Sequence, residues 1–153
     1  MKFIADSMLG RLARWLRLLG HDTLYYPDID DSLLLRIARE EDRMLLTRDT
    51  RLVKVRGLKD FLLLDENDPF EQLKKVITTF NLSPAETRLY SRCSLCNSLL
   101  DTVPKEQVKD LVPKYVYLTT ESFKKCMKCE KCYWEGTHQE RLREKLRDVI
   151  YGD

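Results

Sequence analysis

Three aspartates in the first third of the chain, Asp6, Asp31 and Asp49, are the side chains best suited to catalysis. Two carboxylates about 4 Å apart repel each other by roughly 4 kcal/mol at an effective dielectric constant near 20, so a carboxylate cluster must bind protons, separate or hold a cation. Ligand sets made only of oxygen favour Mg²⁺ or Mn²⁺, which cleave phosphodiester bonds by activating water and stabilising charge on the phosphoryl oxygens. If the fold brings these aspartates together, we expect a catalytic metal site.

Five cysteines form a second group with metal-binding spacing. Cys93 and Cys96 make one C-x-x-C pair, whereas Cys126, Cys129 and Cys132 make two overlapping pairs later in the chain. Paired C-x-x-C motifs of this kind indicate a Zn²⁺ site with four ligands, and a fully thiolate site is structural. The second pair is either Cys126 with Cys129 or Cys129 with Cys132. We favour the first, because the sequence around Cys132 is typical of a strand that leaves the site.

Basic side chains near the aspartates are candidates for contacts with phosphate. Arg11, Arg14 and Arg17 recur at three-residue steps in a segment without acidic residues, so their charges have no local partner. This stripe is either a solvated basic face or a surface that contacts the backbone of a nucleic acid. Arg48, directly before Asp49, is a further candidate for steering such a backbone.

The elements that position the aspartates are expected to be parallel strands alternating with helices. Apolar runs predict strands at residues 2–5, 23–26, 44–47 and 61–64, and apolar residues at three- and four-residue steps predict helices that begin near residues 9, 31 and 68. Asp6 and Asp49 then follow strands, at the carboxyl edge where open α/β sheets bind ligands. Asp31, at a helix start, is either a metal ligand or an N-cap.

The chain divides into an α/β part and a cysteine-bearing part. We assign residues 1–85 to the first domain and residues 90–153 to a zinc ribbon with a closing helix at about residues 139–149. Within the ribbon, the β-prone residues 115–118 predict a strand. A segment this small needs a staple such as zinc to fold.

Composition excludes several classes of protein. The net charge is +2 although 34% of the residues are charged, so no overall nucleic-acid signature exists and local clustering matters more than the total. The sequence has no run of eighteen apolar residues, and Asp6 comes too early for a secretory signal. We expect a cytoplasmic protein without membrane contact, in which reduced cysteines bind metal.

Four motifs together carry a resemblance to a known family. They are DSMLGRLARWLRLLG at residues 6–20, LTRD at residues 46–49, RCSLCN at residues 92–97 and YWEGTH at residues 133–138. In this order, and over nearly the whole chain, they resemble the Mut-seven C-terminal (Mut-C) RNase domain family. The resemblance implies a PIN-like nuclease domain at residues 1–85, a parallel sheet flanked by helices, followed by a small C-terminal zinc ribbon.

The resemblance also implies roles for particular residues. Asp6, Asp31 and Asp49 would form the acidic centre of a metal-dependent ribonuclease, with Asp30 or Asp65 as a fourth acid. The implied zinc ligands are Cys93, Cys96, Cys126 and Cys129. One departure concerns the second cysteine pair, which glycine usually follows: here Glu130 does, and Cys132 stands where an apolar residue is usual.

The leading hypothesis is an endoribonuclease that uses Mg²⁺ or Mn²⁺ at the aspartates and steers RNA with Arg11, Arg14 and Arg48. A non-catalytic RNA-binding module is the main alternative, in which the aspartates are helix caps and partners of the arginines. In a third hypothesis the zinc ribbon docks another protein or a second copy of this chain.

Overall fold

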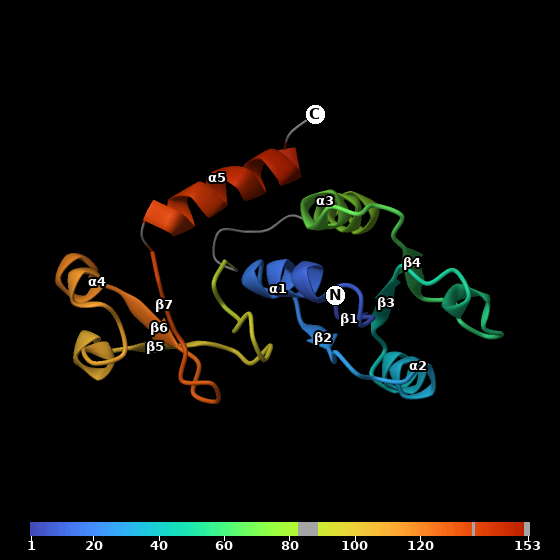
Figure 1. Cartoon of the computed structure of the whole chain (residues 1–153), viewed down its shortest axis with the longest axis horizontal. Helices are drawn as coiled ribbons and strands as arrows, with labels where there is room; N and C mark the ends of the chain where they lie inside the picture. The colour runs from blue at the N-terminus through green and yellow to red at the C-terminus, as the bar shows by residue number, and fades with distance from the viewer. Residues whose placement is uncertain (83–88, 136, 152–153) are drawn as a thin grey trace.

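A computed structural model describes residues 1–82, 89–135 and 137–151 of the chain, although not every side chain of the last helix. The first half is a parallel sheet of four strands in the order β2-β1-β3-β4. The strands are β1 (Phe3–Ala5), β2 (Thr23–Tyr25), β3 (Met44–Thr47) and β4 (Phe61–Leu63). The predicted parallel α/β architecture is therefore confirmed (Figure 1).

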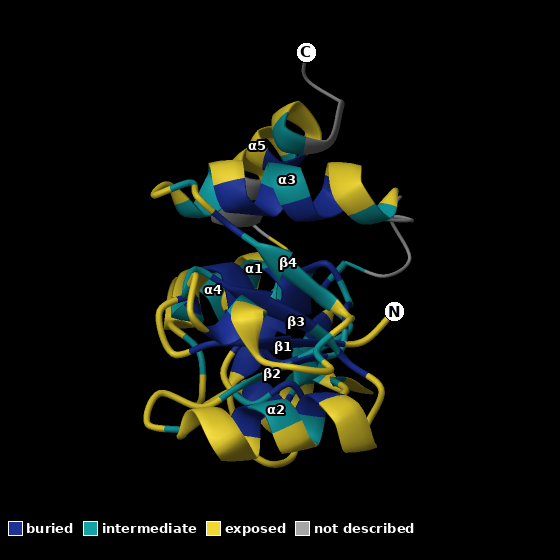
Figure 2. Cartoon of the chain, turned by 90° about the vertical axis from the view of Figure 1, so that its right-hand side faces the viewer, coloured by how far each residue is buried: buried dark blue, intermediate teal, exposed yellow. Residues whose placement is uncertain are grey.

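Helices cover both faces of this sheet. The first face packs against α1 (Gly10–Leu18) and α3 (Pro69–Phe80), and the second against α2 (Asp31–Glu40) and the short 3₁₀ helix η1 (Leu52–Lys54). Because side chains alternate along a strand, Phe3 and Ala5 join the first core, whereas Ile4 joins the second. Figure 2 shows buried positions of α2 and α3 turned toward the sheet.

Local capping signals explain where the helices begin and end. Asp68 caps α3 by accepting a hydrogen bond from Phe70 N, Pro69 follows at the first helical position, and Asn81 ends the helix in a left-handed conformation. In α2, however, the capping residue is Asp30, whose carboxylate accepts a bond from Leu33 N. Of the two alternatives for Asp31, the N-cap is therefore wrong by one residue.

The C-terminal part is built on an antiparallel sheet of three strands in the order β5-β6-β7. Its strands are β5 (Asp101–Val103), β6 (Phe123–Lys125) and β7 (Cys132–Trp134). Between β5 and β6 lie the 3₁₀ helix η3 (Lys105–Val108) and α4 (Lys114–Thr119). The predicted strand at residues 115–118 was therefore wrong: these residues are helical, begin after Pro113, and bury no side chain fully.

The closing helix α5 (Thr137–Tyr151) returns to the α/β part, where Leu146 joins the core beside α3 (Figure 1). The expected boundary between residues 85 and 90 falls largely on residues 83–88, outside the described residues, so the division into residues 1–85 and 90–153 stays a prediction. Among the described residues, no helix is long and apolar enough to cross a membrane.

Candidate functional site

Asp6 and Asp49 lie at the carboxyl ends of the neighbouring parallel strands β1 and β3. Ala5 pairs with Leu46, so Asp6 lies opposite Thr47 and Asp49 follows two residues later. From β1, the chain passes to β2 on one side of the sheet and later to β3 on the other. Such a reversal of strand order leaves a crevice at the carboxyl edge, which is where doubly wound sheets bind ligands.

The carboxylate of Asp6 is almost fully enclosed, with 6% of the residue exposed. Its Oδ1 accepts a hydrogen bond from Met8 N at 2.9 Å, and its Oδ2 accepts one from Arg48 N at 3.0 Å. The hydroxyl of Thr47 donates a further bond to Oδ2. These three donors hold the carboxylate in one orientation and also fasten the end of β1 to the end of β3.

Thr47 connects the two aspartates. Besides donating to Asp6, its completely buried hydroxyl accepts a hydrogen bond from Asp49 N at 3.0 Å. The carboxylate of the half-buried Asp49 accepts a bond from Arg51 N on Oδ1, and no described residue donates to Oδ2. Sequence reasoning missed Thr47, although a hydroxyl that ends an apolar strand between two acids is a usable signal.

The other acidic candidates are more exposed. Asp31 is exposed at the first residue of α2, after β2 and the loop that carries Asp30. Asp65 is exposed after β4. The acidic candidates therefore all follow strands or lie at the start of the next helix. Among the described residues, however, no three carboxylates lie close enough together to form a metal-binding group.

The arginines differ in their surroundings. Arg11 and Arg14 are exposed on α1. Arg48 donates to Asn67 Oδ1 at 2.6 Å and to the carbonyl of Asp65 at 3.4 Å, so it ties the loop after β4 to the carboxyl edge. Arg17, which the sequence placed on the same stripe as Arg11 and Arg14, is buried.

Arg17 acts as a structural link and is not part of an exposed stripe. Its Nε donates to the carbonyl of Thr23 at 2.8 Å, and its Nη1 donates to the carbonyl of Ser94 at 3.0 Å. Burial lowers the pKa of its guanidinium. Because Ser94 lies inside the first cysteine motif, Arg17 joins that motif to the α/β part.

Four cysteines converge on one point in the second half of the chain. Ligand atoms of Cys93, Cys96, Cys126 and Cys129 all lie within 4.8 Å of one another, the only such group within the described part of the chain. A tetrahedral zinc ion with Zn–S bonds of about 2.3 Å would hold its sulfurs about 3.8 Å apart, and Cys96 Sγ lies 3.5 Å from Cys126 Sγ. The four residues therefore fit a closed zinc site.

Cys132 lies apart from this cluster. It is on β7 and packs in an apolar cluster with Val108 and Phe123. The interpretation that Cys132 is a side chain on the strand leaving the site, with Cys126 and Cys129 as the second pair, agrees with this arrangement.

The thiols influence each other's ionisation. Burial opposes ionisation of Cys96, but hydrogen bonding with Ser98 outweighs it and lowers the pKa of Cys96 to about 6. Hydrogen bonding with Cys96 raises the pKa of Cys129 to about 12. Without a cation the cluster therefore favours one thiolate, since further negative charges would repel it; four thiolates need a metal ion to balance them.

Both cysteine loops share one backbone feature. Asn97 and Glu130, which directly follow the second cysteine of each pair, have φ angles of +74° and +61°. Each closes its loop with a backbone hydrogen bond, from Asn97 N to Cys93 O at 2.9 Å and from Glu130 N to Cys126 O at 2.7 Å. This conformation explains why glycine suits the position, and Glu130 occupies it at a steric cost.

The first cysteine loop docks on the amino edge of the parallel sheet. Asn97 Oδ1 accepts a bond from Thr23 N at 2.9 Å, and Asn97 Nδ2 donates to Asp22 Oδ1 at 2.7 Å. Burial would raise the pKa of Asp22, but hydrogen bonds from Arg43 and Asn97 dominate and lower it. Asp22, Thr23 and Arg43 all lie at the starts of strands, so the cysteine cluster is attached to the edge opposite Asp6 and Asp49.

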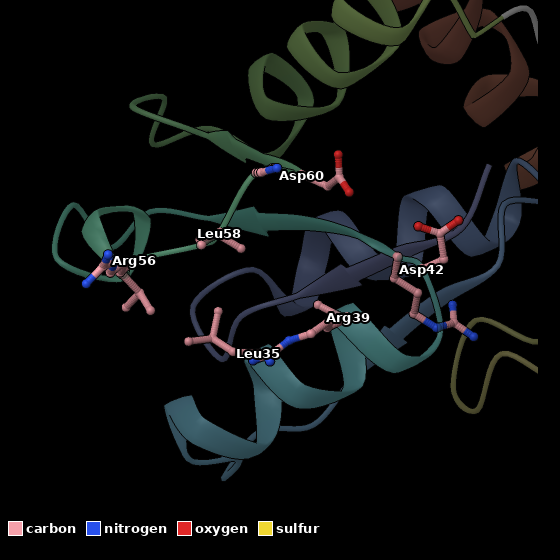
Figure 3. A pocket seen from close by; sticks show the side chains of 11 residues that line it. Leu35, Arg39, Asp42, Arg56, Leu58 and Asp60 are labelled. Carbon is pink, nitrogen blue, oxygen red and sulfur yellow. The ribbon is translucent and has the colours of Figure 1, made fainter.

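A cavity of about 320 Å³ also opens at the amino edge. It lies between α2 and the segment that leads into β4, and Figure 3 shows Arg39, Asp42, Arg56 and Asp60 around it. Asp60 directly precedes β4, so this cavity is separated from Asp6 and Asp49 by the length of the strands. It contains none of the predicted site residues.

Comparison with known proteins places these features in a family context. A family model described as the Mut7-C RNAse domain matches residues 1–146. The chain is 33% identical over 101 residues to a human (Homo sapiens) protein named as an exonuclease mut-7 homolog. That alignment covers 63% of this chain but only 12% of the human protein. No solved structure matches the chain.

Proposed function

The chain belongs to the Mut7-C RNAse domain family, and on that premise we propose that it cleaves RNA phosphodiester bonds at the carboxyl edge of its parallel sheet. The main support for this location is that the Thr47 hydroxyl links the Asp6 carboxylate to the backbone N–H of Asp49. The link holds two acidic residues side by side at a reversal of strand order, where this class of sheet binds ligands.

In this proposal Asp6, Asp31 and Asp49 hold one or two Mg²⁺ or Mn²⁺ ions, with Asp30 or Asp65 as a fourth acid. The donor set fits these ions because it consists of carboxylate oxygens, and Oδ2 of Asp49 accepts no hydrogen bond from the described residues. A divalent ion there would help to activate water and would stabilise charge on the phosphoryl oxygens. Thr47 and the N–H of Arg48 keep Asp6 oriented for this role.

Exposed arginines would bind the RNA backbone. Arg11 and Arg14 extend from the first two turns of α1, the helix that begins beside Asp6. Arg48 supports the same edge by holding Asn67 and the carbonyl of Asp65, so its guanidinium contributes positive charge while ordering a loop. Cleavage within the strand is the mode we propose.

Zinc would have a structural role. The four cysteines leave no open coordination position for a substrate, and their loop is fastened to the opposite edge of the sheet by Asn97 and Arg17. Zinc bound there would stabilise the ribbon and its attachment to the α/β part.

The proposal is tested by titrating Mg²⁺ and Mn²⁺ into protein that has been stripped of loosely bound metal but retains its zinc. We expect cleavage of single-stranded RNA only when a divalent ion is added, and slower cleavage of a single-stranded DNA of matched sequence. Zinc content is measured in the same samples, so that loss of activity through an unfolded ribbon is recognised. RNA cleavage that persists in chelator would contradict the metal-dependent mechanism.

One observation favours the alternative of a non-catalytic RNA-binding module. The Asp6 carboxylate already accepts three hydrogen bonds, which is sufficient reason for an aspartate to end β1. In that case the protein would bind RNA but would not cleave it with any divalent ion. A docking role for the ribbon, toward another protein or a second copy of the chain, would use exposed apolar side chains such as Leu111, Tyr115 and Leu118.

A further inference from the structure

A second cavity, of about 380 Å³, lies in the C-terminal part of the chain. Aromatic residues form part of its wall, and the remainder is contributed by the connection between α4 and β6 and by the residues around β7. Its lining includes Tyr90, Tyr133, Trp134, Lys124 and Glu135. The volume is in the range of small-ligand pockets, and neither the aspartates nor the zinc ligands line it.

Tyr90 is held in this wall in an unusual conformation. Its φ angle is +58°, its backbone N–H donates to the carbonyl of Leu18 at 2.9 Å, and its carbonyl accepts a bond from Lys124 Nζ at 3.2 Å. Left-handed backbone at a bulky aromatic residue is rare and persists only where the surroundings impose it. The two bonds therefore fix the position of Tyr90 against the cavity.

The hydroxyl of Tyr90 has no hydrogen-bond partner among the described residues, although only 8% of the residue is exposed. Burial raises the pKa of this hydroxyl, so it is a neutral donor and acceptor at physiological pH. A buried hydroxyl without a partner destabilises the protein, and a ligand that offers a polar atom to it recovers that loss. The hydroxyl of Tyr133 differs, because it accepts a bond from Ser94 N and donates one to Cys93 Sγ.

We propose that this cavity binds one unpaired base of a single-stranded RNA. Unpaired bases are recognised by stacking on aromatic rings and by hydrogen bonds to their polar edges. Here the partly exposed ring of Trp134 offers a stacking surface, and the free hydroxyl of Tyr90 offers a polar partner. Lys124 adds positive charge for the attached phosphate.

This inference deepens the proposed function, on which it rests for the nature of the substrate. Tyr90 binds the carbonyl of Leu18, the last residue of α1, whereas Asp6 lies before the first turn of that helix. A helix of nine residues is about 14 Å long, so Tyr90 and Asp6 lie near opposite ends of a helix of that length. The substrate would be a flexible single strand that spans several nucleotides between the two places.

Binding is tested without cleavage in a chain that carries Asp49→Asn, so that the RNA stays intact. Trp15→Phe in the same chain leaves Trp134 as the only tryptophan, and its fluorescence reports occupancy of the cavity. The probes are a single-stranded RNA oligonucleotide and an abasic strand of the same length, which keeps the phosphates but has no bases. We expect saturable quenching of Trp134 by the RNA and none by the abasic strand.

Affinities are measured in parallel from the anisotropy of labelled RNA. Tyr90→Phe removes only the hydroxyl and should weaken binding about 2- to 12-fold, and Trp134→Leu should weaken it about 5- to 150-fold. Tyr115→Phe, on the exposed side of α4, is the matched control and should have no effect. Zinc content identifies any variant whose ribbon has unfolded. If Trp134→Leu unfolds, the test of the base pocket depends on Tyr90→Phe, which keeps the aromatic ring and its packing.

Equal quenching by both strands, or unchanged affinity in Tyr90→Phe, would overturn the base pocket. Binding of another protein at Trp134 that leaves RNA affinity unaffected would do the same. The outcome is independent of the nuclease proposal. If the chain binds bases at Trp134 but never cleaves RNA, the base pocket is supported and the nuclease proposal is wrong. If the chain cleaves RNA but RNA does not quench Trp134, the nuclease proposal is supported and the base pocket is wrong.

Discussion

The hydroxyl of Thr47 donates a hydrogen bond to the carboxylate of Asp6 across the neighbouring parallel strands β1 and β3. The same hydroxyl oxygen accepts a bond from the backbone of Asp49, so one buried side chain sets the positions of both acids. The acidic edge therefore depends on a residue that carries no charge.

Thr47→Val keeps the shape of this side chain but removes its donor and its acceptor. Because a hydroxyl bond to Asp6 and the acceptor for Asp49 N are both lost, we expect the free energy of unfolding to fall by about 1 to 3 kcal/mol. RNA cleavage should fall more than RNA affinity. Urea unfolding and cleavage rates check this, with Thr47→Ser, which keeps the hydroxyl, as the control. Parental cleavage by the valine variant would show that Thr47 does not position the acids.

Asp49→Asn separates an enzyme from a binding module. The variant removes a charge from a proposed metal ligand, so Mg²⁺- or Mn²⁺-dependent cleavage should fall by several orders of magnitude while RNA binding persists. Asp6→Asn should lose cleavage equally, but it should also lose about 1 to 3 kcal/mol of stability, because an amide cannot accept all three bonds that Asp6 accepts. Cleavage at the parental rate in both variants would assign the activity to another site or to a contaminant.

One zinc ion per chain should be bound by the four clustered cysteines. Apparent zinc affinities in structural sites are about 10 to 16 kcal/mol, which exceeds the stability of a small ribbon, so loss of one ligand should unfold it. Cys93→Ser and Cys126→Ser should each lower zinc content and increase proteolysis after residue 90. Cys132→Ala is the matched control, because Cys132 packs away from the cluster. Zinc loss in that control would overturn the ligand assignment.

Glu130→Gly should stabilise the second cysteine loop. The left-handed conformation costs a residue with a side chain about 1 to 2 kcal/mol, and the extra freedom of glycine in the unfolded chain offsets about 0.5 to 1 kcal/mol of the gain. A net increase of about 0.5 to 1 kcal/mol in unfolding free energy is expected, measured with zinc present. Lys128→Gly, in the same loop but without a positive φ, should be destabilising; equal effects of both glycines would contradict the argument.

Arg14→Ala should reduce the salt dependence of RNA binding. Each phosphate contact contributes about 0.7 to the slope of log affinity against log salt for a single strand. Arg14 is exposed on the helix that begins beside Asp6, whereas the exposed Arg39 lines the cavity at the opposite edge of the sheet. Titrations at several salt concentrations should give a flatter slope for Arg14→Ala and an unchanged slope for Arg39→Ala. If neither variant changes the salt dependence of RNA binding, the face around Arg14 is a solvated surface that does not contact phosphate.

Local signals in the sequence were sufficient for the architecture of the α/β part. Apolar runs and helical periodicity predicted the strands and helices, and the helix expected to begin near residue 68 was confirmed as α3, which Asp68 caps. The cysteine spacing predicted a cluster, and the structure brings the expected four thiols together. These features depend on residues close in sequence, or on a cysteine spacing that allows only a few sets of ligands.

The sequence-based expectations that were wrong have a different cause. Residues 115–118 have β-forming side chains, but they follow Pro113 and lie outside the ribbon sheet, so no strand partner is available and a short helix forms. Arg17 shares its spacing with Arg14, yet it is buried because Thr23 and Ser94 present carbonyls to it. The absence of a strand partner decided the first outcome, and a distant segment of the chain decided the second.

The sequence by itself determined which residues follow strands and which thiols come in pairs. Tertiary structure alone decided that Thr47 joins Asp6 to Asp49, that the cysteine cluster is attached to the opposite edge of the sheet, and that the Tyr90 hydroxyl is buried without a partner. The physical reason is that hydrogen bonding and burial depend on which atoms meet in space. Most of these contacts join residues tens of positions apart, and a local sequence pattern does not encode contacts of that kind.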